Sequence, residues 1–199
     1  MITLYHSPRS RSTRIVALLK DLDALDHVAI EVVTIPRMDG SGGRDPRNPH
    51  PDGKVPVLDH DGVLVWESSA IVQYLAELFP DAGLSVPVGD PQRGAYLSWL
   101  AWYAGVVEPV LTLQALGLDH PGLAKTFRTS DDLKARLAAA LADRPYLLGE
   151  RYTAADLLLH SPYAWFGKPG VLAIDAWVDR CMDRPGAHYA AEFDARHGA

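Results

Sequence analysis

The chain has 199 residues with a formal net charge of −6 at pH 7; hydrophobic residues make up 48% of it and charged residues 22%. This is the composition of a globular protein with enough apolar material for a sizeable core. The mildly acidic charge argues against a nucleic-acid-binding protein, which presents a basic surface. No run approaches the roughly 20 apolar residues that a membrane span needs.

The chain contains a single cysteine, Cys181. One cysteine cannot form a disulfide within the chain, and this usage favours a reducing compartment. The N-terminus lacks the basic start and long apolar run of a secretory signal. We therefore expect a cytoplasmic protein.

The first part of the chain alternates strand and helix patterns. Residues 2–5 predict a short strand, and apolar residues spaced at i, i+3, i+4 and i+7 over 15–22 predict an amphipathic helix. Residues 27–35 are rich in Val and Ile and predict a second strand. A strand, a helix and a strand in this order predict a parallel pair of strands.

A loop and a hairpin are predicted next. Residues 36–53 are crowded with Gly and Pro and show no helical period, which predicts a loop. Residues 55–66 predict a hairpin, because Asp61-Gly62 is a two-residue turn signal between apolar runs. Residues 71–79 carry the apolar stripe of a helix. We expect a small α/β domain over residues 1–80.

The second part of the chain reads as helical. Residues 81–90 lie in a stretch rich in Pro and Gly and predict a linker. Beyond it the strand-like alternation disappears, and residues 91–199 predict an all-helical domain. Thr153 stands three residues before Asp156, which is the spacing of a helix capping box.

Pro56 raises a structural question because it lies within an apolar run. A cis Val55-Pro56 bond would bend the chain and turn the backbone N–H and C=O of Val55 outward, free to pair with an extended ligand. A trans proline at the first residue of a strand is the alternative.

Two predicted helix starts carry side chains suited to a charged ligand. Glu67 and Ser68 open the helix after the hairpin; its free N–H groups suit a carboxylate, and Glu67 suits an ammonium group. Ser10 and Ser12 precede the first helix, where a thiolate would be stabilised. Simple helix capping is the alternative role for each serine.

The motifs together resemble the cytosolic glutathione transferases. The resemblance covers nearly the whole chain and rests on LYHSPRSRSTRIVALL, NPHPDGKVPVL, WESSAIVQYLAELFP and GERYTAADLLLH. It implies an α/β thioredoxin-like N-terminal domain followed by an all-α helical C-terminal domain. The opening motif looks like that of serine-type, theta-like bacterial members.

The resemblance implies roles for residues around the hairpin. It implies that Val55, before a cis Pro56, pairs through its backbone with the cysteinyl part of glutathione. Glu67 and Ser68 would hold the γ-glutamyl group.

The same resemblance implies a catalytic serine. Ser10 would donate a hydrogen bond to the glutathione sulfur, with Ser12 and Tyr5 as alternatives. Lys54 and His50 would lie near the glycine end.

The sequence departs from the family in two places. Residues 36–53 are rich in Gly and Pro where the family usually has a short helix, which bears on the contacts with the glycine end. No cysteine lies near position 10, which disfavours the redox branches. Cys181 falls in a late helix, as a small buried hydrophobe would.

The implied function is a homodimeric transferase that joins the glutathione thiolate to small hydrophobic electrophiles. Glutathione would be the co-substrate, and we expect no metal, no nucleic acid and no membrane partner. The electrophile pocket is expected between the domains and would be lined by Trp102, Tyr103, Tyr163, Trp165 and Phe166. The alternatives are a glutathione-dependent reductase or peroxidase, an isomerase, a dehalogenase, or a non-catalytic binding protein of the same fold.

Overall fold

The computed structural model describes residues 1–198 and divides into two compact units. The first unit comprises Met1–Ala82 together with the chain from Arg184 onward, and the second comprises Gly83–Asp183. Among the helices of residues 1–198, none combines the length and the apolar character that a membrane span requires.

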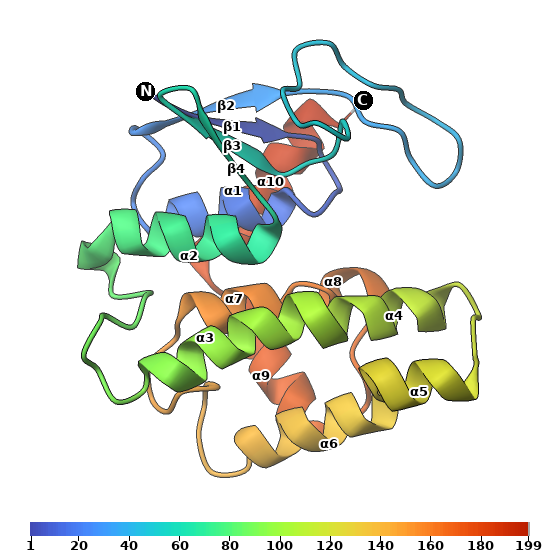
Figure 1. Cartoon of the computed structure of the whole chain (residues 1–199). Helices are drawn as coiled ribbons and strands as arrows, with labels where there is room; N and C mark the ends of the chain where they lie inside the picture. The colour runs from blue at the N-terminus through green and yellow to red at the C-terminus, as the bar shows by residue number, and fades with distance from the viewer. Residues whose placement is uncertain (199) are drawn as a thin grey trace. The chain divides into compact units, whose positions relative to one another are not determined.

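The first unit is a four-stranded sheet with helices packed on it (Figure 1). Its elements are β1 (Ile2–His6), α1 (Thr13–Asp21), β2 (Val28–Val32), β3 (Val57–His60), β4 (Val63–Trp66), α2 (Ser68–Leu78), the 3-10 turn η1 (Pro80–Ala82) and α10 (Pro185–His197).

The strand order is β2-β1-β3-β4. β1 pairs with β2 in parallel and with β3 in antiparallel, and β3 pairs with β4 in antiparallel. The predicted parallel pair and the predicted hairpin are therefore confirmed. Asp61 and Gly62 make the hairpin turn with φ values of 51° and 86°, as a two-residue turn with two positive φ angles requires.

The core of the first unit forms where α1 and α2 cover one face of the sheet (Figure 1). Apolar side chains from the strands and from both helices meet there because their spacing places them on the inward faces. The largest fully buried members are Leu4, Ile15, Leu18, Leu19, Leu58, Ile71 and Leu75.

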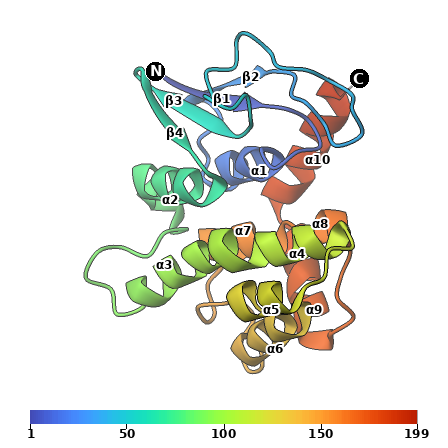
Figure 2. The same ribbon diagram turned by 45° about the vertical axis from the view of Figure 1, so that its right-hand side comes forward.

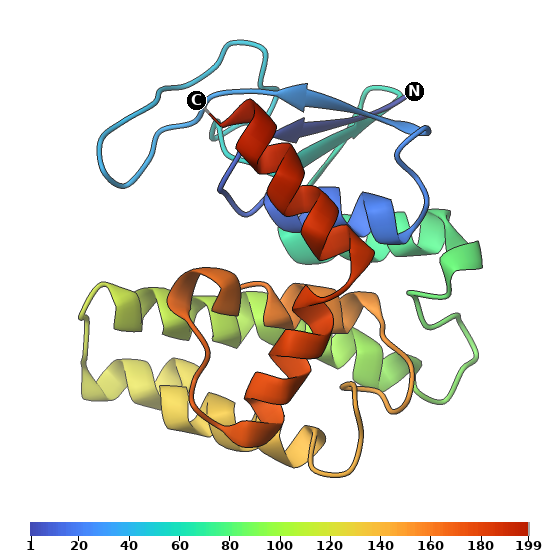
Figure 3. The same cartoon turned by 180° about the vertical axis from the view of Figure 1, so that it is seen from behind.

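The helix α10 corrects the predicted domain division. We expected residues 184–199 to belong to the helical domain, but α10 lies along α1 in the first unit (Figure 3). A Cβ atom on Gly186 would lie 2.4 Å from the carbonyl oxygen of Ala17, so the two helices approach too closely for a side chain there. In chain order the last helix follows the helical unit, so the sequence suggested that it belonged there. Its return to the first unit depends on tertiary packing, which chain order does not reveal.

The second unit is helical, as predicted. Its elements are α3 (Arg93–Trp102), the π-helical segment η2 (Tyr103–Val107), α4 (Glu108–Ala115), α5 (Pro121–Phe127), α6 (Ser130–Ala140), α7 (Ala154–His160), α8 (Tyr163–Phe166) and α9 (Leu172–Met182). The helix α6 packs against α4 and α9 (Figure 2). The π-helical segment ends just before Glu108-Pro109; proline has no N–H with which to continue the regular helical ladder.

The capping box predicted at the start of α7 is present. Asp156 Oδ2 accepts hydrogen bonds from the backbone N–H of Thr153 at 2.9 Å and from its hydroxyl at 3.0 Å. Asp156 Oδ1 accepts from the backbone N–H of Leu147 at 2.9 Å and from Trp177 Nε1 at 3.0 Å. One buried carboxylate thus ties α7 to α9 and to the segment before it.

Candidate functional site

The strand register places several predicted site residues at one end of the sheet. Tyr5, near the end of β1, lies opposite Val57 at the start of β3, and Val57 lies opposite Trp66 at the end of β4. The serine turn after β1, the Val55-Pro56 step before β3 and Glu67 after β4 therefore share this end. The arrowhead of β1 points toward this end of the sheet in Figure 1.

Hydrogen bonds within the turn hold its serines together. The Oγ atoms of Ser10 and Ser12 lie 2.8 Å apart. Ser10 Oγ also lies 2.6 Å from the carbonyl oxygen of Ser7 and accepts from the backbone N–H of Ser12 at 3.2 Å. Ser12 is fully buried, whereas Ser10 is partly exposed. Ser10 is therefore the more accessible of the two residues to a ligand.

A buried histidine lies behind the serines. Ser12 Oγ is 2.8 Å from Nδ1 of His6, the last residue of β1, and it accepts a hydrogen bond from the backbone N–H of Ser7 at 3.0 Å. His6 is fully buried. Side chains alternate across a strand, so His6 lies on the same face of β1 as the buried Leu4, and Tyr5 lies on the opposite face.

Asp194 of α10 completes this group of side chains. Its Oδ1 lies 3.1 Å from His6 Nε2, which is ion-pair distance, although the alignment is not that of a good hydrogen bond. Its Oδ2 accepts from the backbone N–H of Arg9 at 2.6 Å and from the Thr13 hydroxyl at 2.7 Å. Burial alone raises the pKa of Asp194, but the contacts with His6, Thr13 and Arg9 together lower it below its ordinary value. The carboxyl group is therefore ionised at neutral pH.

The Val55-Pro56 peptide bond is cis. Both residues are buried at the point where the chain enters β3. The sequence left cis and trans open, and the structure decides for cis.

The segment before Val55 is a loop, as predicted, because residues 36–53 form neither helix nor strand. His50 is buried in this loop, donates from its backbone N–H to Asn48 Oδ1 and accepts at Nδ1 from the backbone N–H of Asp52, both at 3.0 Å. The Lys54 side chain is exposed, and its carbonyl accepts from Asn48 Nδ2 at 3.0 Å. Lys54 is thus more available to a ligand than His50.

Glu67 and Ser68 mark the start of α2, as predicted. Glu67 is the N-cap residue with φ 69° and ψ 125°, and its side chain makes no capping hydrogen bond. A positive φ is uncommon outside glycine and costs about 1–3 kcal/mol. The exposed Glu67 carboxylate is free to take a partner beside the first N–H groups of the helix.

Three of the predicted pocket aromatics come together in the second unit. Tyr163, Trp165 and Phe166 of α8 line a hollow of about 560 Å³ with side chains of α4 and α6. Burial, with a contribution from the negative charge of Asp175, raises the pKa of Tyr163 to about 12. Its phenol is therefore a neutral hydrogen-bond donor at neutral pH.

Trp102 and Tyr103 are not among the residues that line this hollow. Trp102 contacts Trp99 edge-to-face at 5.3 Å, and the Arg136 guanidinium lies 5.3 Å from the Trp102 ring. Tyr103 is 1% exposed and belongs to the core. The predicted aromatic set is therefore divided between a hollow and helix packing.

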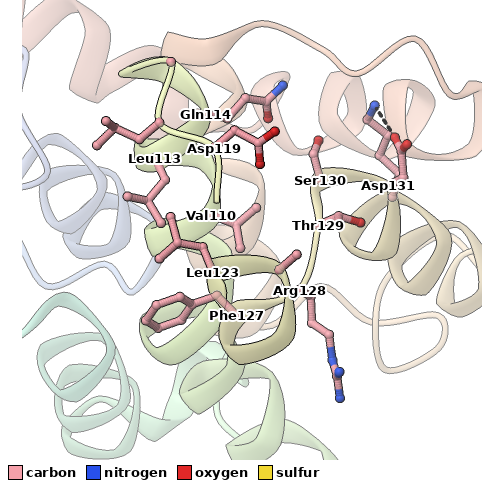
Figure 4. A pocket seen from close by; sticks show the side chains of 14 residues that line it. Val110, Leu113, Gln114, Asp119, Leu123, Phe127, Arg128, Thr129, Ser130 and Asp131 are labelled. Carbon is pink, nitrogen blue, oxygen red and sulfur yellow. Dashed lines mark hydrogen bonds and ion pairs between the residues drawn. The ribbon is translucent and has the colours of Figure 1, made fainter. Parts of the chain in front are cut away.

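A second hollow of about 460 Å³ lies among α4, α5 and α6 (Figure 4). Val110, Leu113, Leu123 and Phe127 supply apolar side chains to it, and Asp119 adds a carboxylate. It contains none of the site residues predicted from the sequence.

Sequence reasoning missed His6, Asp194 and Arg37. The predicted first strand ended at Tyr5, so His6 was assigned to the turn that follows it. His6 nevertheless continues the strand alternation and lies on the same buried face as Leu4. Asp194 follows Gly186 and Ala190 at helical spacing, and this stripe was the available signal. Arg37 donates from Nη2 to Ser7 Oγ at 3.2 Å and to the Pro8 carbonyl at 2.9 Å, bringing a positive charge to the serine turn. The sequence carries no local signal for that contact.

Residues 2–83 match the family model described as the N-terminal domain of glutathione S-transferase. The matched segment contains β1 to β4, α1 and α2, and hence the serine turn, the cis Val55-Pro56 bond and Glu67.

Two relatives are similar over most of their length. A glutathione S-transferase of Hyoscyamus muticus is 30% identical over 200 residues, covering 90% of this chain and 92% of that protein. The glutathione S-transferase GstA of Escherichia coli O157:H7 is 30% identical over 155 residues, covering 68% of this chain and 71% of that one. The chain spans 63% of an uncharacterized GST-like protein of Streptococcus mutans, at 29% identity.

Solved structures share the whole fold. A glutathione transferase from Methylococcus capsulatus is similar with a TM-score of 0.77 and 25% identity, covering 98% of this chain and 100% of that one. A theta class glutathione S-transferase from Xanthomonas axonopodis pv. citri, solved with glutathione bound, is similar with a TM-score of 0.72 and 28% identity, covering 96% of both chains. The sequence, the fold and the end of the sheet that carries the serine turn agree: this chain belongs to the glutathione S-transferase family.

Proposed function

We propose that the protein joins the thiolate of glutathione to small hydrophobic electrophiles, with Ser10 as the residue that stabilises the thiolate. The observation that carries the proposal is that Ser10, just before α1, is partly exposed, in the unit that matches the glutathione S-transferase N-terminal domain. A hydrogen-bond donor beside a helix start is the environment that lowers a thiol pKa.

Ser10 is the preferred residue among the three candidates. Ser12 is fully buried behind Ser10, and its hydroxyl is engaged with His6 and Ser7. Tyr5 lies on the other face of β1 from His6, away from the serine pair. Both hydroxyls contact neighbouring groups, so the greater exposure of the residue Ser10 is what favours it for contact with the sulfur.

The energetics of this role are adequate. A free thiol has a pKa of about 8.5, and a drop of about 2 units corresponds to about 2.7 kcal/mol. A hydrogen bond to a charged group contributes about 1.5–3 kcal/mol, and a helix terminus about 0.3–1 kcal/mol. One serine and one helix start can together account for an ionised thiol at neutral pH.

The rest of glutathione would extend along the same end of the sheet. Val55 would pair with the cysteinyl backbone next to the cis Pro56. Glu67 and Ser68 would hold the γ-glutamyl group. The Glu67 carboxylate makes no capping hydrogen bond to α2, which supports this role. Lys54 and His50 would lie near the glycine carboxylate, with the exposed Lys54 as the more available of the two.

The electrophile would contact aromatic side chains of the second unit. Tyr163, Trp165 and Phe166 support this, since they line one hollow and the Tyr163 phenol remains a donor. Trp102 and Tyr103 would not contact the electrophile in this hollow, because they do not line it.

We also propose a homodimer and a cytoplasmic location. Val63 and Trp66, on the edge strand β4, are 67% and 50% exposed, and a second copy would cover them. The one cysteine, Cys181, is buried and forms no disulfide within the described residues, which fits a compartment that keeps thiols reduced.

A substrate panel tests the proposal. The protein would be incubated with glutathione and, in separate assays, an activated chloronitroarene, an organic hydroperoxide, a glutathione mixed disulfide, a haloalkane and an isomerisable enone. Thioether formation that saturates with glutathione supports the transferase. Turnover of only one of the other substrates would move the assignment to the corresponding reductase, peroxidase, dehalogenase or isomerase. Glutathione binding without turnover would leave a binding protein.

A further inference from the structure

The side chains of Asp194, His6, Ser12 and Ser10 form one continuous line of polar contacts. Asp194 Oδ1 lies 3.1 Å from His6 Nε2, His6 Nδ1 lies 2.8 Å from Ser12 Oγ, and Ser12 Oγ lies 2.8 Å from Ser10 Oγ. The line begins at a buried carboxylate and ends at the partly exposed hydroxyl proposed to contact the glutathione sulfur. We propose that the His6–Asp194 pair accepts the thiol proton of glutathione through the two serine hydroxyls; this inference rests on the proposed function.

The His6–Asp194 pair is buried. His6 is fully buried and Asp194 is 8% exposed. His6 Nε2 and Asp194 Oδ1 lie 3.1 Å apart, and neither atom makes a hydrogen bond to another group among residues 1–198. A carboxylate only accepts, so Nε2 of the neutral ring carries the proton and Nδ1 is left as an acceptor for Ser12.

The proton transfer balances without any additional reactant. The S–H bond of glutathione breaks as its proton bonds to Ser10 Oγ. The Ser10 proton passes to Ser12 Oγ, and the Ser12 proton bonds to His6 Nδ1. The products are a thiolate that accepts a hydrogen bond from Ser10 and an imidazolium paired with the Asp194 carboxylate.

Each hydrogen bond along the line reverses in this transfer. Before it, Ser12 donates to His6 and Ser10 donates to Ser12, which requires the Ser10 O–H to turn away from the Ser7 carbonyl oxygen 2.6 Å from it. After it, His6 donates to Ser12, Ser12 donates to Ser10, and Ser10 donates outward to the sulfur. The imidazolium thus orients the hydroxyl that stabilises the thiolate, which makes His6 and Asp194 positioning residues.

The elements around His6 carry other charged and titratable groups. Arg37 reaches the Ser7 hydroxyl, and the buried Arg14 lies in α1. On α10, Phe193 contacts the His6 ring edge-to-face at 5.4 Å, and His197 stacks on Phe193 at 4.1 Å. Asp194 is the acidic group that contacts the His6 ring.

Calorimetry of glutathione binding tests the transfer directly. Titrations near pH 7 in buffers of different protonation enthalpy give the protons released to solvent, and ultraviolet absorbance gives the thiolate formed. Transfer to His6 predicts far less than one proton released per thiolate. One proton released for each thiolate would overturn the inference while leaving the proposed function intact. Absence of glutathione binding or of thiolate would overturn both.

Asp194→Asn provides the matched variant. Asparagine retains an acceptor for Thr13 and Arg9 but removes the charge that favours imidazolium, so the bound thiol pKa should rise by about 1 unit or more. Binding of S-methylglutathione, which has no thiol proton, should change less than about twofold, the expectation for an intact binding surface. An unchanged thiol pKa in this variant would contradict the inference.

Asp21→Asn serves as the control. Asp21 Oδ2 accepts from Arg184 Nε at 3.1 Å, and its Oδ1 accepts from the Gly186 backbone N–H at 3.0 Å. It therefore connects α1 to α10 without taking part in the proton line. This variant should keep the wild-type proton count and thiol pKa. If it lost them as Asp194→Asn does, the role of Asp194 would be reduced to holding the helix in place.

Discussion

Ser10 and Ser12 share a hydrogen bond between Oγ atoms 2.8 Å apart, with Ser12 fully buried and Ser10 partly exposed. The two serines are two residues apart in the sequence, and both precede the same helix. Because of this difference in exposure, Ser10 is accessible to a ligand, whereas Ser12 makes structural hydrogen bonds behind it. Substitutions at the two sites should therefore fail in different ways.

Ser10→Ala should raise the pKa of the bound glutathione thiol by about 1–2 units, because it removes one hydrogen bond of about 1.5–3 kcal/mol to a charged group. Thiolate absorbance against pH measures the change. Ser98→Ala, which removes an exposed hydroxyl on α3, is the control and should leave the pKa unchanged. A Ser10→Ala protein with the wild-type thiol pKa would exclude Ser10 as the sulfur ligand.

Ser12→Ala should lower the free energy of unfolding of the first unit by about 1–3 kcal/mol, because buried partners lose their hydrogen bonds. The Ser7 N–H loses its acceptor and His6 Nδ1 loses its partner. Urea denaturation followed by circular dichroism measures the loss. A stability equal to that of Ser10→Ala would show that burial does not distinguish the two serines.

Gly186→Ala should destabilise the packing of α10 on α1 by about 1–3 kcal/mol, the range for overpacked sites. The added Cβ would meet the backbone carbonyl of Ala17 at 2.4 Å, and a backbone atom cannot rotate away. Hydrogen exchange of α10 amides should report the loss. Gly94→Ala in α3 has open space around its Cβ and should not destabilise the protein. Equal exchange rates in the two variants would argue against the close approach.

Asp156→Ala should lower the free energy of unfolding of the second unit by at least about 3 kcal/mol, because several buried donors lose their acceptor. Thermal denaturation followed by near-ultraviolet circular dichroism should detect it through Trp177, whose Nε1 donates to this carboxylate. Asp131→Ala, at an exposed carboxylate, is the control and should stay within about 0.5 kcal/mol of wild type. A similar small loss for Asp156→Ala would contradict the structural role assigned to the capping box.

The ionisation of Asp45 should make the free energy of unfolding depend on pH in the acidic range. Hydrogen bonds from the Arg47 side chain and backbone lower its pKa from 3.8 to about 2. The unfolded chain therefore takes up this proton first as the pH falls, so the stabilising contribution is present above pH 3.8 and is lost toward pH 2. Asp45→Asn should remove this part of the acid dependence in urea titrations. An unchanged slope over that range would show that Asp45 ionises normally.

Local signals in the sequence predicted most of the elements. The parallel strand pair followed from the strand, helix, strand order, the hairpin followed from Asp61-Gly62, and the start of α7 followed from Thr153 and Asp156. These features depend on residues close together in the chain, whose steric and hydrogen-bonding preferences act over a few positions. The short helices α5 and α8 were not predicted, because a helix of one or two turns has too little apolar period to detect.

The motifs also predicted which segments form the candidate site, but not how its side chains are arranged. The cis state of Val55-Pro56 was undecided from the sequence, because both isomers are compatible with a proline at the start of a strand. The proposed preference for Ser10 over Ser12 as the residue that contacts the ligand rests on their different burial, which depends on tertiary packing.

By itself, the sequence determined the α/β and helical parts of this protein, the serine turn and the family to which it belongs. Only the tertiary structure placed Asp194 beside His6, because the two residues are 188 positions apart and meet through the packing of α10 on α1. That packing depends on the close approach at Gly186 and on the buried face of α10. Contacts of this kind arise from the complementary shapes of surfaces far apart in the chain, which no local pattern encodes.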